Sequence, residues 1–257
     1  MVLKDRIAIV TGGSSGIGRG IAIEFAREGA KVVVADIREA PKQGKYHDQD
    51  VTTPTVAEIE GVGGEAIFLQ TDVADTQQIE RMIDTTVERF GGLDILMSNA
   101  GVNSFGDIEH TSLEDWDRVI GVNQRAAFWA TRLAVPHLKK SGRGRILYIA
   151  SVLAFVGGGG IPYAASKSAL VNMVRDLALD LGPSGVTANA ICPGYIETPI
   201  QDWLTADQIE KIRGRTPLPR FGKPRDIGRA AVFLASEDAE WITGASLVVD
   251  GGLLCNL

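Results

Sequence analysis

Short apolar runs alternate with longer segments of helical period along almost the whole chain, and this alternation constrains the fold more than any other feature. Most of the runs are continuously apolar, as strands buried on both faces of a parallel sheet are. The predicted strands cover residues 7–10, 31–35, 66–70, 93–97, 145–150, 186–191 and 246–249, and the predicted helices cover 16–28, 75–90, 112–121, 125–140, 162–181, 205–213 and 224–236. The order predicts one doubly wound α/β domain over residues 1–257, with a seven-stranded parallel sheet and helices on both faces.

Two segments interrupt the regular alternation. Residues 38–53 are polar and contain Pro41 and Gly44 at the point where the chain should enter its next helix. Residues 195–220 are broken up by prolines around a short predicted helix. Because long loops at the carboxyl edge of a parallel sheet commonly carry function, we expect residues 195–220 to form a lid over a bound substrate.

The composition excludes several classes of protein. The net charge is -6, whereas a nucleic-acid partner requires a basic surface. No apolar run approaches the ~20 residues needed to cross a bilayer, and residues 1–6 carry no apolar signal region. The cysteines, Cys192 and Cys255, lie far apart without a CxxC pattern or a histidine cluster. We therefore expect a cytoplasmic protein with reduced thiols and no metal site, which binds a small molecule rather than nucleic acid or membrane.

A glycine-rich loop, residues 11–18 with the sequence TGGSSGIG, joins the first predicted strand to the first predicted helix. Glycines at that place let backbone N–H groups and the helix N-terminus approach a dinucleotide pyrophosphate. The spacing between Gly12 and Gly16 is one residue longer than in the common GxGxxG pattern. Glycines also serve tight turns, but the strand before this loop and the helix after it favour dinucleotide binding.

An acidic residue, Asp36, follows the apolar run of the second predicted strand. A carboxylate at that place can accept hydrogen bonds from both hydroxyls of an adenosine ribose, and it repels a 2′-phosphate. The alternative is an ordinary turn aspartate after a strand. We expect Asp36 to favour NAD over NADP.

Tyr163 and Lys167 lie four residues apart in a predicted helix, so they stand one turn apart on one face. An ammonium fixed beside a phenol favours the phenolate, which brings the pKa of the tyrosine closer to working pH and makes it a useful acid–base catalyst. Ser151 stands upstream, directly after the fifth predicted strand. The alternative is an amphipathic helix in which a tyrosine and a lysine happen to be four apart.

Further short motifs follow the predicted strands in a fixed order. They are Asp72-Val73, Asn99-Ala100-Gly101, Asn123, Pro193-Gly194, Thr198 and Asp250-Gly251-Gly252. With these motifs the chain resembles the short-chain dehydrogenase/reductase family of the Tyr-x3-Lys type over essentially its whole length. The resemblance implies a Rossmann-type fold and hydride transfer between a nicotinamide and the carbon of a CH–OH group.

The resemblance also implies a role for each catalytic residue. Tyr163 is expected to exchange a proton with the substrate oxygen, and Ser151 to donate a hydrogen bond to that oxygen. Lys167 is expected to bind the nicotinamide ribose and to lower the pKa of Tyr163. Asn123 is expected to hold a water through which the proton reaches solvent, although by itself it could equally be a helix-bending residue.

The cofactor contacts that the resemblance implies lie along the carboxyl edge of the sheet. The residues implied to bind NAD are Gly12, Ser14, Ser15, Ile17, Asp36, Asp72, Val73, Asn99, Gly101, Tyr163, Lys167, Pro193, Ile196 and Thr198. Asp72 and Val73 would line the adenine and Thr198 would anchor the carboxamide, although Asp72 could instead cap a helix.

NADP-dependent members of the family often carry a basic residue just before the second glycine of the loop or just after the second strand. This chain has Ser15 and Ile37 at those positions. Arg38, one position further on, is the one nearby cation that could meet a 2′-phosphate. The resemblance therefore implies NAD as the cofactor, with some residual use of NADP conceivable.

The chain departs from the family pattern in two places. Ser98 stands where the family usually shows the first of two asparagines, and we expect it to face the other side of its strand. The separation between Asp36 and Asp72 is longer than the family norm, and the excess falls in residues 41–53. This extra segment could touch the adenine ribose or decorate the surface, and decoration is the favoured interpretation.

The substrate is less constrained than the chemistry. The expected pocket residues are Asn103, Leu153, Phe155, Tyr195 and Trp203. Their mainly apolar character favours a secondary alcohol or ketone with a hydrocarbon body. A sugar 1-dehydrogenase stays open because polar groups such as Ser104 and Glu197 could satisfy sugar hydroxyls.

Two further alternatives remain. A 3-oxoacyl thioester reductase could use Arg125, Arg132 and Arg175 to dock an acidic carrier protein. A nucleotide-binding regulator without catalysis is possible in principle, but the intact set of catalytic residues speaks against it.

Members of the resembled family usually form homotetramers through the two long helices that correspond to residues 125–140 and 162–181. In this chain the helices carry small and apolar residues suited to close contact, which are Ala126, Ala127, Phe128, Ala130, Leu133, Ala169, Leu170, Met173 and Leu177. We therefore expect a homotetramer with these helices at the larger interface.

Overall fold

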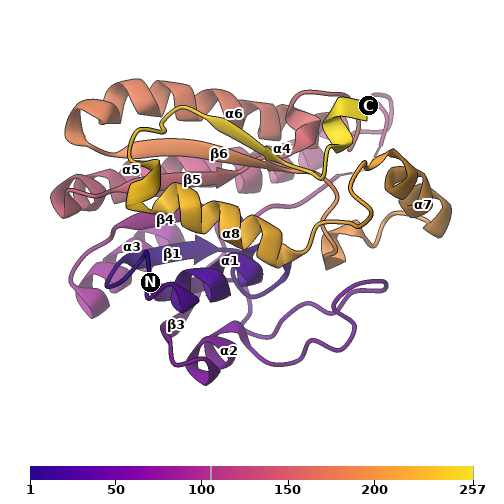
Figure 1. The fold of residues 1–257 in the computed structure, drawn as a ribbon. Helices are drawn as coiled ribbons and strands as arrows, with labels where there is room; N and C mark the ends of the chain where they lie inside the picture. Colours follow the sequence, from indigo (N-terminus) through magenta and orange to yellow (C-terminus); the bar gives the residue numbers. More distant parts are fainter. Residues whose placement is uncertain (105, 257) are drawn as a thin grey trace.

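A computed structural model describes residues 1–104 and 106–256, and in this part of the chain seven strands form one parallel sheet (Figure 1). The strands are β1 (Ile7–Thr11), β2 (Lys31–Asp36), β3 (Glu65–Gln70), β4 (Ile95–Ser98), β5 (Arg145–Ile149), β6 (Thr187–Pro193) and β7 (Ser246–Val249). Their order is β3-β2-β1-β4-β5-β6-β7, so the direction of winding reverses between β1 and β4. The predicted doubly wound Rossmann-type fold is confirmed.

Helices cover both faces of the sheet (Figure 1). They are α1 (Gly16–Arg27), α2 (Thr55–Gly61), α3 (Thr76–Phe90), α4 (Leu113–Ile120), α5 (Ala126–Ser141), α6 (Ile161–Leu181), α7 (Ala206–Arg215) and α8 (Pro224–Ala235). Local signals fix several ends. The Asp75 carboxylate accepts hydrogen bonds from the first backbone N–H groups of α3, and Gly91 ends that helix in the left-handed conformation with φ 85°.

Two apolar cores lie on opposite faces of the sheet. One is formed with α3, α5 and α6, and the other with α1, α2 and α8. All residues of β4, β5 and β6 are buried, as the continuous apolar runs predicted. Within residues 1–104 and 106–256, no helix is both long enough and apolar enough to cross a membrane.

The structure differs from the predicted elements in the first half of the chain. Helix α2 was not predicted, because its seven residues are too few to show a helical period, and only Pro54 before it marks a helix start. Between α4 and α5 the helix widens into a π-helical turn, Gly121–Arg125, which contains Asn123. Such turns are rare and occur mostly at functional sites.

The extra segment between β2 and α2 has no regular secondary structure. We call residues 41–50 the strap and residues 195–220 the lid segment. In Figure 1 the strap belongs to the purple loop that leaves the sheet between β2 and α2 and reaches out on the side where the orange lid segment carries α7. Backbone hydrogen bonds from the strap to Asp202 show that the two segments touch.

Candidate active site

The reversal point of the sheet brings together the loops that follow β1 and β4. The side-chain amide of Asn99 donates to the carbonyl oxygens of Thr11, at 2.9 Å, and Gly12, at 3.2 Å. The Thr11 hydroxyl accepts from the backbone N–H groups of Asn99 and Ala100 at 3.0 and 3.1 Å. These bonds lock the glycine-rich loop at the place where parallel sheets of this kind bind ligands.

Glycines in this loop are required by close packing. A Cβ atom on Gly18 would lie 2.0 Å from the Gly12 carbonyl oxygen, and one on Gly12 would lie 2.9 Å from the Ala100 Cα. Gly12 and Gly16 also have positive φ angles, 64° and 52°, which favour glycine. The loop therefore presents backbone at the start of α1, where phosphate binds in dinucleotide sites.

A free polar group in the same loop fits a dinucleotide. The hydroxyl of Ser14 is buried and has no hydrogen-bond partner among residues 1–104 and 106–256. A buried hydroxyl without a partner is costly, so its position at a phosphate-binding turn suits a ligand oxygen. Thr198, from the lid segment, closes the other side, because its methyl carbon would lie 3.2 Å from a Cβ on Gly16. The residues present thus fit the pyrophosphate of a nicotinamide dinucleotide.

The carboxylate of Asp36 lies against the glycine-rich loop. One oxygen accepts from the Ser14 backbone N–H at 3.0 Å, and the other accepts from the Ile37 N–H at 2.8 Å. Burial raises the pKa of Asp36, while backbone hydrogen bonds from Ser14, Ile37 and Arg38 act in the opposite direction. The structure therefore places a carboxylate beside the glycine-rich loop, where the sequence predicts the adenosine ribose.

The other predicted cofactor residues lie at the same edge of the sheet. Val73, Ile196 and Thr198 are buried, and Pro193 ends β6. Asp72 is exposed, and its carboxylate accepts from the Ala74 backbone N–H at 2.9 Å, so it shapes the turn before α3. The helix cap before α3 is Asp75 rather than Asp72, and the contact of Asp72 with adenine stays a prediction.

Tyr163 and Lys167 occupy successive turns at the start of α6, as predicted. The Lys167 ammonium nitrogen lies 5.6 Å from the centre of the Tyr163 ring and donates to the Ile149 carbonyl oxygen at 2.7 Å. Ser151 stands two residues after the end of β5, and the interaction of its side chain with Tyr163 acts to lower the pKa of that tyrosine. The three side chains that the sequence separates are thus neighbours at the carboxyl end of β5.

Burial dominates the protonation of this cluster. It lowers the pKa of Lys167 to about 8, and it raises the pKa of Tyr163, with the hydrogen bond from Ser151 acting in the lowering direction. The net direction for Tyr163 differs from the lowered pKa that the sequence led us to expect. The physical reason is that the phenolate loses water on burial, while the Lys167 ammonium is directed to the Ile149 carbonyl oxygen.

Asn123 ties the loop after β4 to α6. Its side-chain oxygen accepts from the Val102 N–H at 2.8 Å, and its amide donates to the Val102 carbonyl and to the Ser166 hydroxyl, both at 3.0 Å. Ser166 in turn donates to the Tyr163 carbonyl oxygen at 2.7 Å. Asn123 therefore supports the backbone that carries Tyr163, and its expected contact with a proton-relay water stays a prediction.

Gly101 leaves room beside the catalytic cluster. A Cβ on this residue would lie 3.4 Å from the Asn123 side-chain oxygen and 3.5 Å from the Lys167 ammonium nitrogen. Gly101, Asn123 and Lys167 thus border one space, whereas the contact of Gly101 with the adenosine ribose side of a cofactor stays a prediction.

The expected substrate residues divide into two groups. Leu153 reaches the Tyr163 side of the groove, because a Cβ on Gly159 would lie 2.7 Å from its methyl carbon and 3.3 Å from the Tyr163 ring. Phe155 and Trp203 are 44% and 41% exposed, which leaves aromatic surface available to a ligand. The side-chain oxygen of Asn103 accepts from the Ser104 N–H at 2.9 Å and shapes its own loop.

Tyr195 packs within the lid segment. Its ring packs on Phe221 with centroids 4.1 Å apart, and its hydroxyl is hydrogen-bonded to the His47 imidazole at 3.0 Å. The side chain is buried in the small core of the lid segment, so its contact with substrate stays a prediction. The contact of His47 with Tyr195 was not predicted, because no local sequence pattern in the strap indicates a partner so distant in the sequence.

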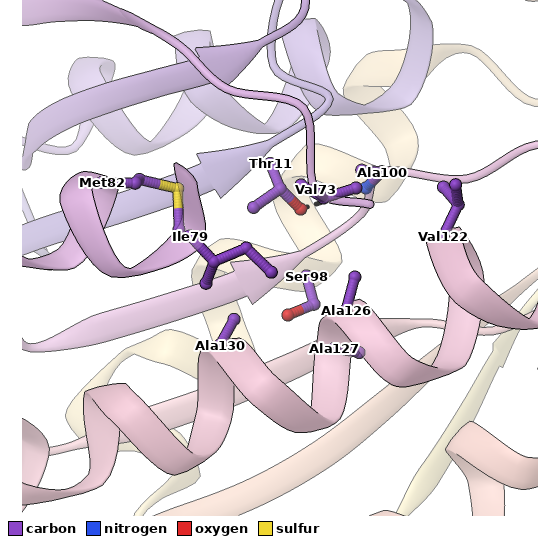
Figure 2. Close-up of a pocket in the computed structure, with 10 residues that line it drawn as sticks. All are labelled: Thr11, Val73, Ile79, Met82, Ser98, Ala100, Val122, Ala126, Ala127 and Ala130. Carbon is purple, nitrogen blue, oxygen red and sulfur yellow. Dashed lines mark hydrogen bonds between the residues drawn. The ribbon is translucent and has the colours of Figure 1, made fainter. Parts of the chain in front are cut away.

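Ser98 lines a small cavity beneath β4 (Figure 2). The Ser98 side chain lies between β4 and α5 in this view, and its hydroxyl is buried without a hydrogen-bond partner in the described part of the chain. The cavity is lined by Thr11, Val73, Ile79, Met82, Ser98, Ala100, Val122, Ala126, Ala127 and Ala130. Ser98 faces away from the groove as predicted, and this mainly apolar, enclosed space lies behind the site rather than in it.

Comparison with known proteins supports this geometry. A family model described as enoyl-(acyl carrier protein) reductase matches residues 12–254. A 2,5-dichloro-2,5-cyclohexadiene-1,4-diol dehydrogenase of Sphingobium indicum is 39% identical over 97% of this chain and 96% of its own length. An L-rhamnose 1-dehydrogenase (NAD(P)(+)) of Azotobacter vinelandii is 38% identical and covers 100% of both chains.

A solved structure shows the same arrangement of elements. A 7α-hydroxysteroid dehydrogenase complexed with NADH and 7-oxo glycochenodeoxycholic acid superposes with a TM-score of 0.89 and is 35% identical, covering 97% of this chain and 94% of the other. The similarity extends over whole chains, and the glycine-rich loop, Ser151, Tyr163 and Lys167 stand together in the structure. This protein belongs to the short-chain dehydrogenase/reductase family and is an oxidoreductase that acts on CH–OH groups.

Proposed function

We propose that this protein is an NAD-dependent dehydrogenase/reductase that interconverts a secondary alcohol and a ketone on a largely apolar molecule. The observation that carries the proposal is the cluster at the carboxyl end of β5, where Ser151 and Tyr163 lie together and the Lys167 ammonium lies 5.6 Å from the centre of the Tyr163 ring and donates to the Ile149 carbonyl oxygen. A phenol, a hydroxyl and an ammonium in this arrangement can hold a substrate oxygen and transfer its proton.

The proposed mechanism assigns one step to each residue. NAD supplies the acceptor for the hydride that leaves the carbinol carbon. Ser151 and Tyr163 orient the substrate oxygen between them, and the Tyr163 oxygen accepts the proton of the alcohol. With a cofactor bound, Lys167 would hold the ribose hydroxyls of the nicotinamide and would place positive charge near the phenolate. In the reverse direction Tyr163 returns the proton to the carbonyl oxygen.

Asp36 supports NAD rather than NADP. Its half-buried carboxylate is fixed against the glycine-rich loop by the backbone N–H groups of Ser14 and Ile37. A 2′-phosphate placed beside it would meet a like charge that cannot move away. The solved 7α-hydroxysteroid dehydrogenase contains NADH, which fits this choice, whereas the rhamnose dehydrogenase is named for both cofactors.

An apolar alcohol is the substrate class that the pocket supports best. Leu153, Phe155 and Trp203 would form its wall, with the lid segment closing over it. Two of the similar proteins are named for ring alcohols or ketones, the cyclohexadienediol and the steroid. The similarity to a rhamnose dehydrogenase keeps a sugar 1-dehydrogenase as the second candidate.

We also propose that the protein assembles as a homotetramer and works in the cytoplasm. Phe128 on α5 and Leu179 on α6 are 51% and 77% exposed, which gives both helices apolar surface for a partner. Ala126, Ala127 and Leu170, expected at this interface from the sequence, instead pack into the core of the same chain. Cys192 and Cys255 are free thiols, which fits a reducing compartment.

An assay of nicotinamide absorbance over a panel of substrates tests the proposal. We expect reduction of NAD with cyclic secondary alcohols and oxidation of NADH with the matching ketones. Preferred turnover of free aldoses would favour the sugar dehydrogenase. Tight binding of NADH without turnover of any alcohol, sugar, ketone or 3-oxoacyl thioester would contradict the catalytic proposal.

A further inference from the structure

The strap rests on the glycine-rich loop at one end. The backbone N–H of Lys42 donates to the Ser15 hydroxyl at 2.6 Å. Beyond the strap, the buried Thr55 hydroxyl donates to the Gly13 carbonyl oxygen at 2.9 Å and accepts from Arg19 at 3.1 Å. The chain that leaves the sheet after Asp36 is therefore attached to the loop proposed to bind pyrophosphate, both on its way out and on its way back.

The far end of the strap is attached to the lid segment by one carboxylate. The two oxygens of Asp202 accept from the backbone N–H groups of Lys45, at 2.9 Å, and Tyr46, at 3.4 Å. The donors in these bonds are backbone N–H groups of the strap. The bonds therefore depend on the backbone conformation of the strap and not on its side chains. Asp202 is half-buried, which strengthens such bonds relative to those of an exposed carboxylate.

The fit between strap and lid segment is close. A Cβ on Gly44 would lie 2.5 Å from the His47 carbonyl oxygen and 3.1 Å from both an Asp202 carboxylate oxygen and the Pro199 Cα. His47 adds a second link through its hydrogen bond with the Tyr195 hydroxyl, inside the core of the lid segment. The strap thus touches the glycine-rich loop and the lid segment, the two segments that we place on either side of the dinucleotide.

We propose that the strap is the outer wall of the dinucleotide groove and that Asp202 is a positioning residue, which fastens this wall to the lid segment. The inference rests on the proposed function, because it assigns the groove to NAD. A dinucleotide held between the strap and the glycine-rich loop fixes the strap, and through Asp202 it fixes the lid segment. Binding of the cofactor therefore orders the substrate side of the site, and binding of substrate strengthens binding of the cofactor by the same factor.

Asp202→Ala removes both bonds to the strap without changing the catalytic cluster or Asp36. We expect the Kd for NADH, measured by nicotinamide fluorescence, and the KM of the alcohol substrate each to rise about tenfold, the usual scale for losing hydrogen bonds to a charged group. We expect kcat to stay within about twofold of the wild type, because chemistry follows once the lid is closed. Asp202→Asn keeps one acceptor oxygen, so its Kd and KM should lie between those of wild type and Asp202→Ala. Asp207→Ala, which removes an exposed carboxylate from the first turn of α7, is the matched control and should behave as wild type.

Hydrogen exchange and limited proteolysis distinguish loss of the link between strap and lid segment from general destabilisation of the fold. In wild type, saturating NADH should slow hydrogen exchange in the strap and in α7, and it should slow tryptic cleavage after the exposed Lys42 and Lys45. In Asp202→Ala the effect of NADH on α7 should disappear. Gly44→Ala should repeat this result by steric displacement, whereas Gly61→Ala should not, because outside its own helix turn a Cβ there meets no atom of the described residues within 4 Å.

The outcomes distinguish this inference from the proposed function. If wild type does not bind NADH, the proposed function is wrong and the inference with it. If wild type binds NADH but Asp202→Ala and Gly44→Ala match it in Kd, KM and exchange of α7, only the role of the strap and Asp202 is overturned.

Discussion

The Lys167 ammonium nitrogen lies 5.6 Å from the centre of the Tyr163 ring and donates to the Ile149 carbonyl oxygen at 2.7 Å. The lysine is 4% exposed, so its charge is held in the interior of the protein by few partners. Burial lowers its pKa to about 8. Lys167, which is expected to stabilise the Tyr163 phenolate, therefore destabilises the fold while its ammonium is charged.

This relationship predicts how stability depends on pH. Above pH ~8 the folded protein loses the Lys167 proton, while the unfolded chain keeps it up to pH ~10, so the free energy of unfolding gains a contribution that rises across this window. The gain is on the order of 3 kcal/mol in full. Lys167→Met lacks this pH-dependent contribution. Urea unfolding of cofactor-free wild type and Lys167→Met, at several pH values between 7 and 9.5, measures how the free energy of unfolding differs between them. Parallel stability curves for the two proteins would contradict the shifted pKa.

Substitution of Asp36 should change the choice of cofactor. We expect wild type to show at least a hundredfold higher kcat/KM with NAD than with NADP, since ~1.4 kcal/mol already corresponds to tenfold and a confined like-charge contact costs several times that. Asp36→Ala should reduce the ratio of kcat/KM with NAD to kcat/KM with NADP, because the carboxylate is gone and Arg38 remains nearby. Glu39→Ala removes an exposed charge close by and should leave the preference unchanged. Equal use of both cofactors by wild type would show that Asp36 does not select.

The glycine-rich loop offers a steric test of the cofactor groove. Gly18→Ala would place a Cβ 2.0 Å from the Gly12 carbonyl oxygen, so the loop must move. We expect weakening of NADH binding by at least tenfold, measured by fluorescence titration, together with a lower melting temperature. Gly214→Ala lies in α7, where a Cβ meets no atom within 4 Å, and should bind NADH like wild type. Unchanged NADH affinity in Gly18→Ala would place the cofactor elsewhere.

Assembly can be tested on the exposed face of α5. Sedimentation at micromolar concentration should show a tetramer for wild type, and Phe128→Glu should dissociate it, because a charge would replace a 51% exposed aromatic side chain at the proposed interface. Val62→Glu changes a residue of similar exposure, 47%, just after α2 and should leave the tetramer intact. A stable wild-type monomer would refute the proposal.

Local patterns were sufficient to predict the sheet and the catalytic cluster. Each predicted strand coincides with an observed one to within two or three residues, because buried parallel strands are continuously apolar. Tyr163 and Lys167 lie on one helix, and Ser151 stands two residues after a strand, so regular geometry brings them together.

Contacts between distant loops could not be predicted in this way. The bonds from Asp202 to the strap and from Tyr195 to His47 join residues about 150 positions apart, and they depend on backbone donors and a buried hydroxyl that carry no sequence pattern. The π-helical turn at Asn123 adds one residue to a helical turn, which hydrophobic spacing does not reveal. Small residues such as Ala130 suit either a core or an interface, so their spacing could not tell which way they face.

The most direct test of the account is the turnover of Tyr163→Phe measured beside its affinity for NADH. The substitution removes only the phenolic oxygen, so we expect kcat for a cyclic secondary alcohol to fall by ~10²–10⁴, the usual value of a positioned acid–base group, while the Kd for NADH changes by less than about threefold. That result would confirm Tyr163 as the group that exchanges the proton. Near-normal turnover in Tyr163→Phe with intact NADH binding would contradict the central claim.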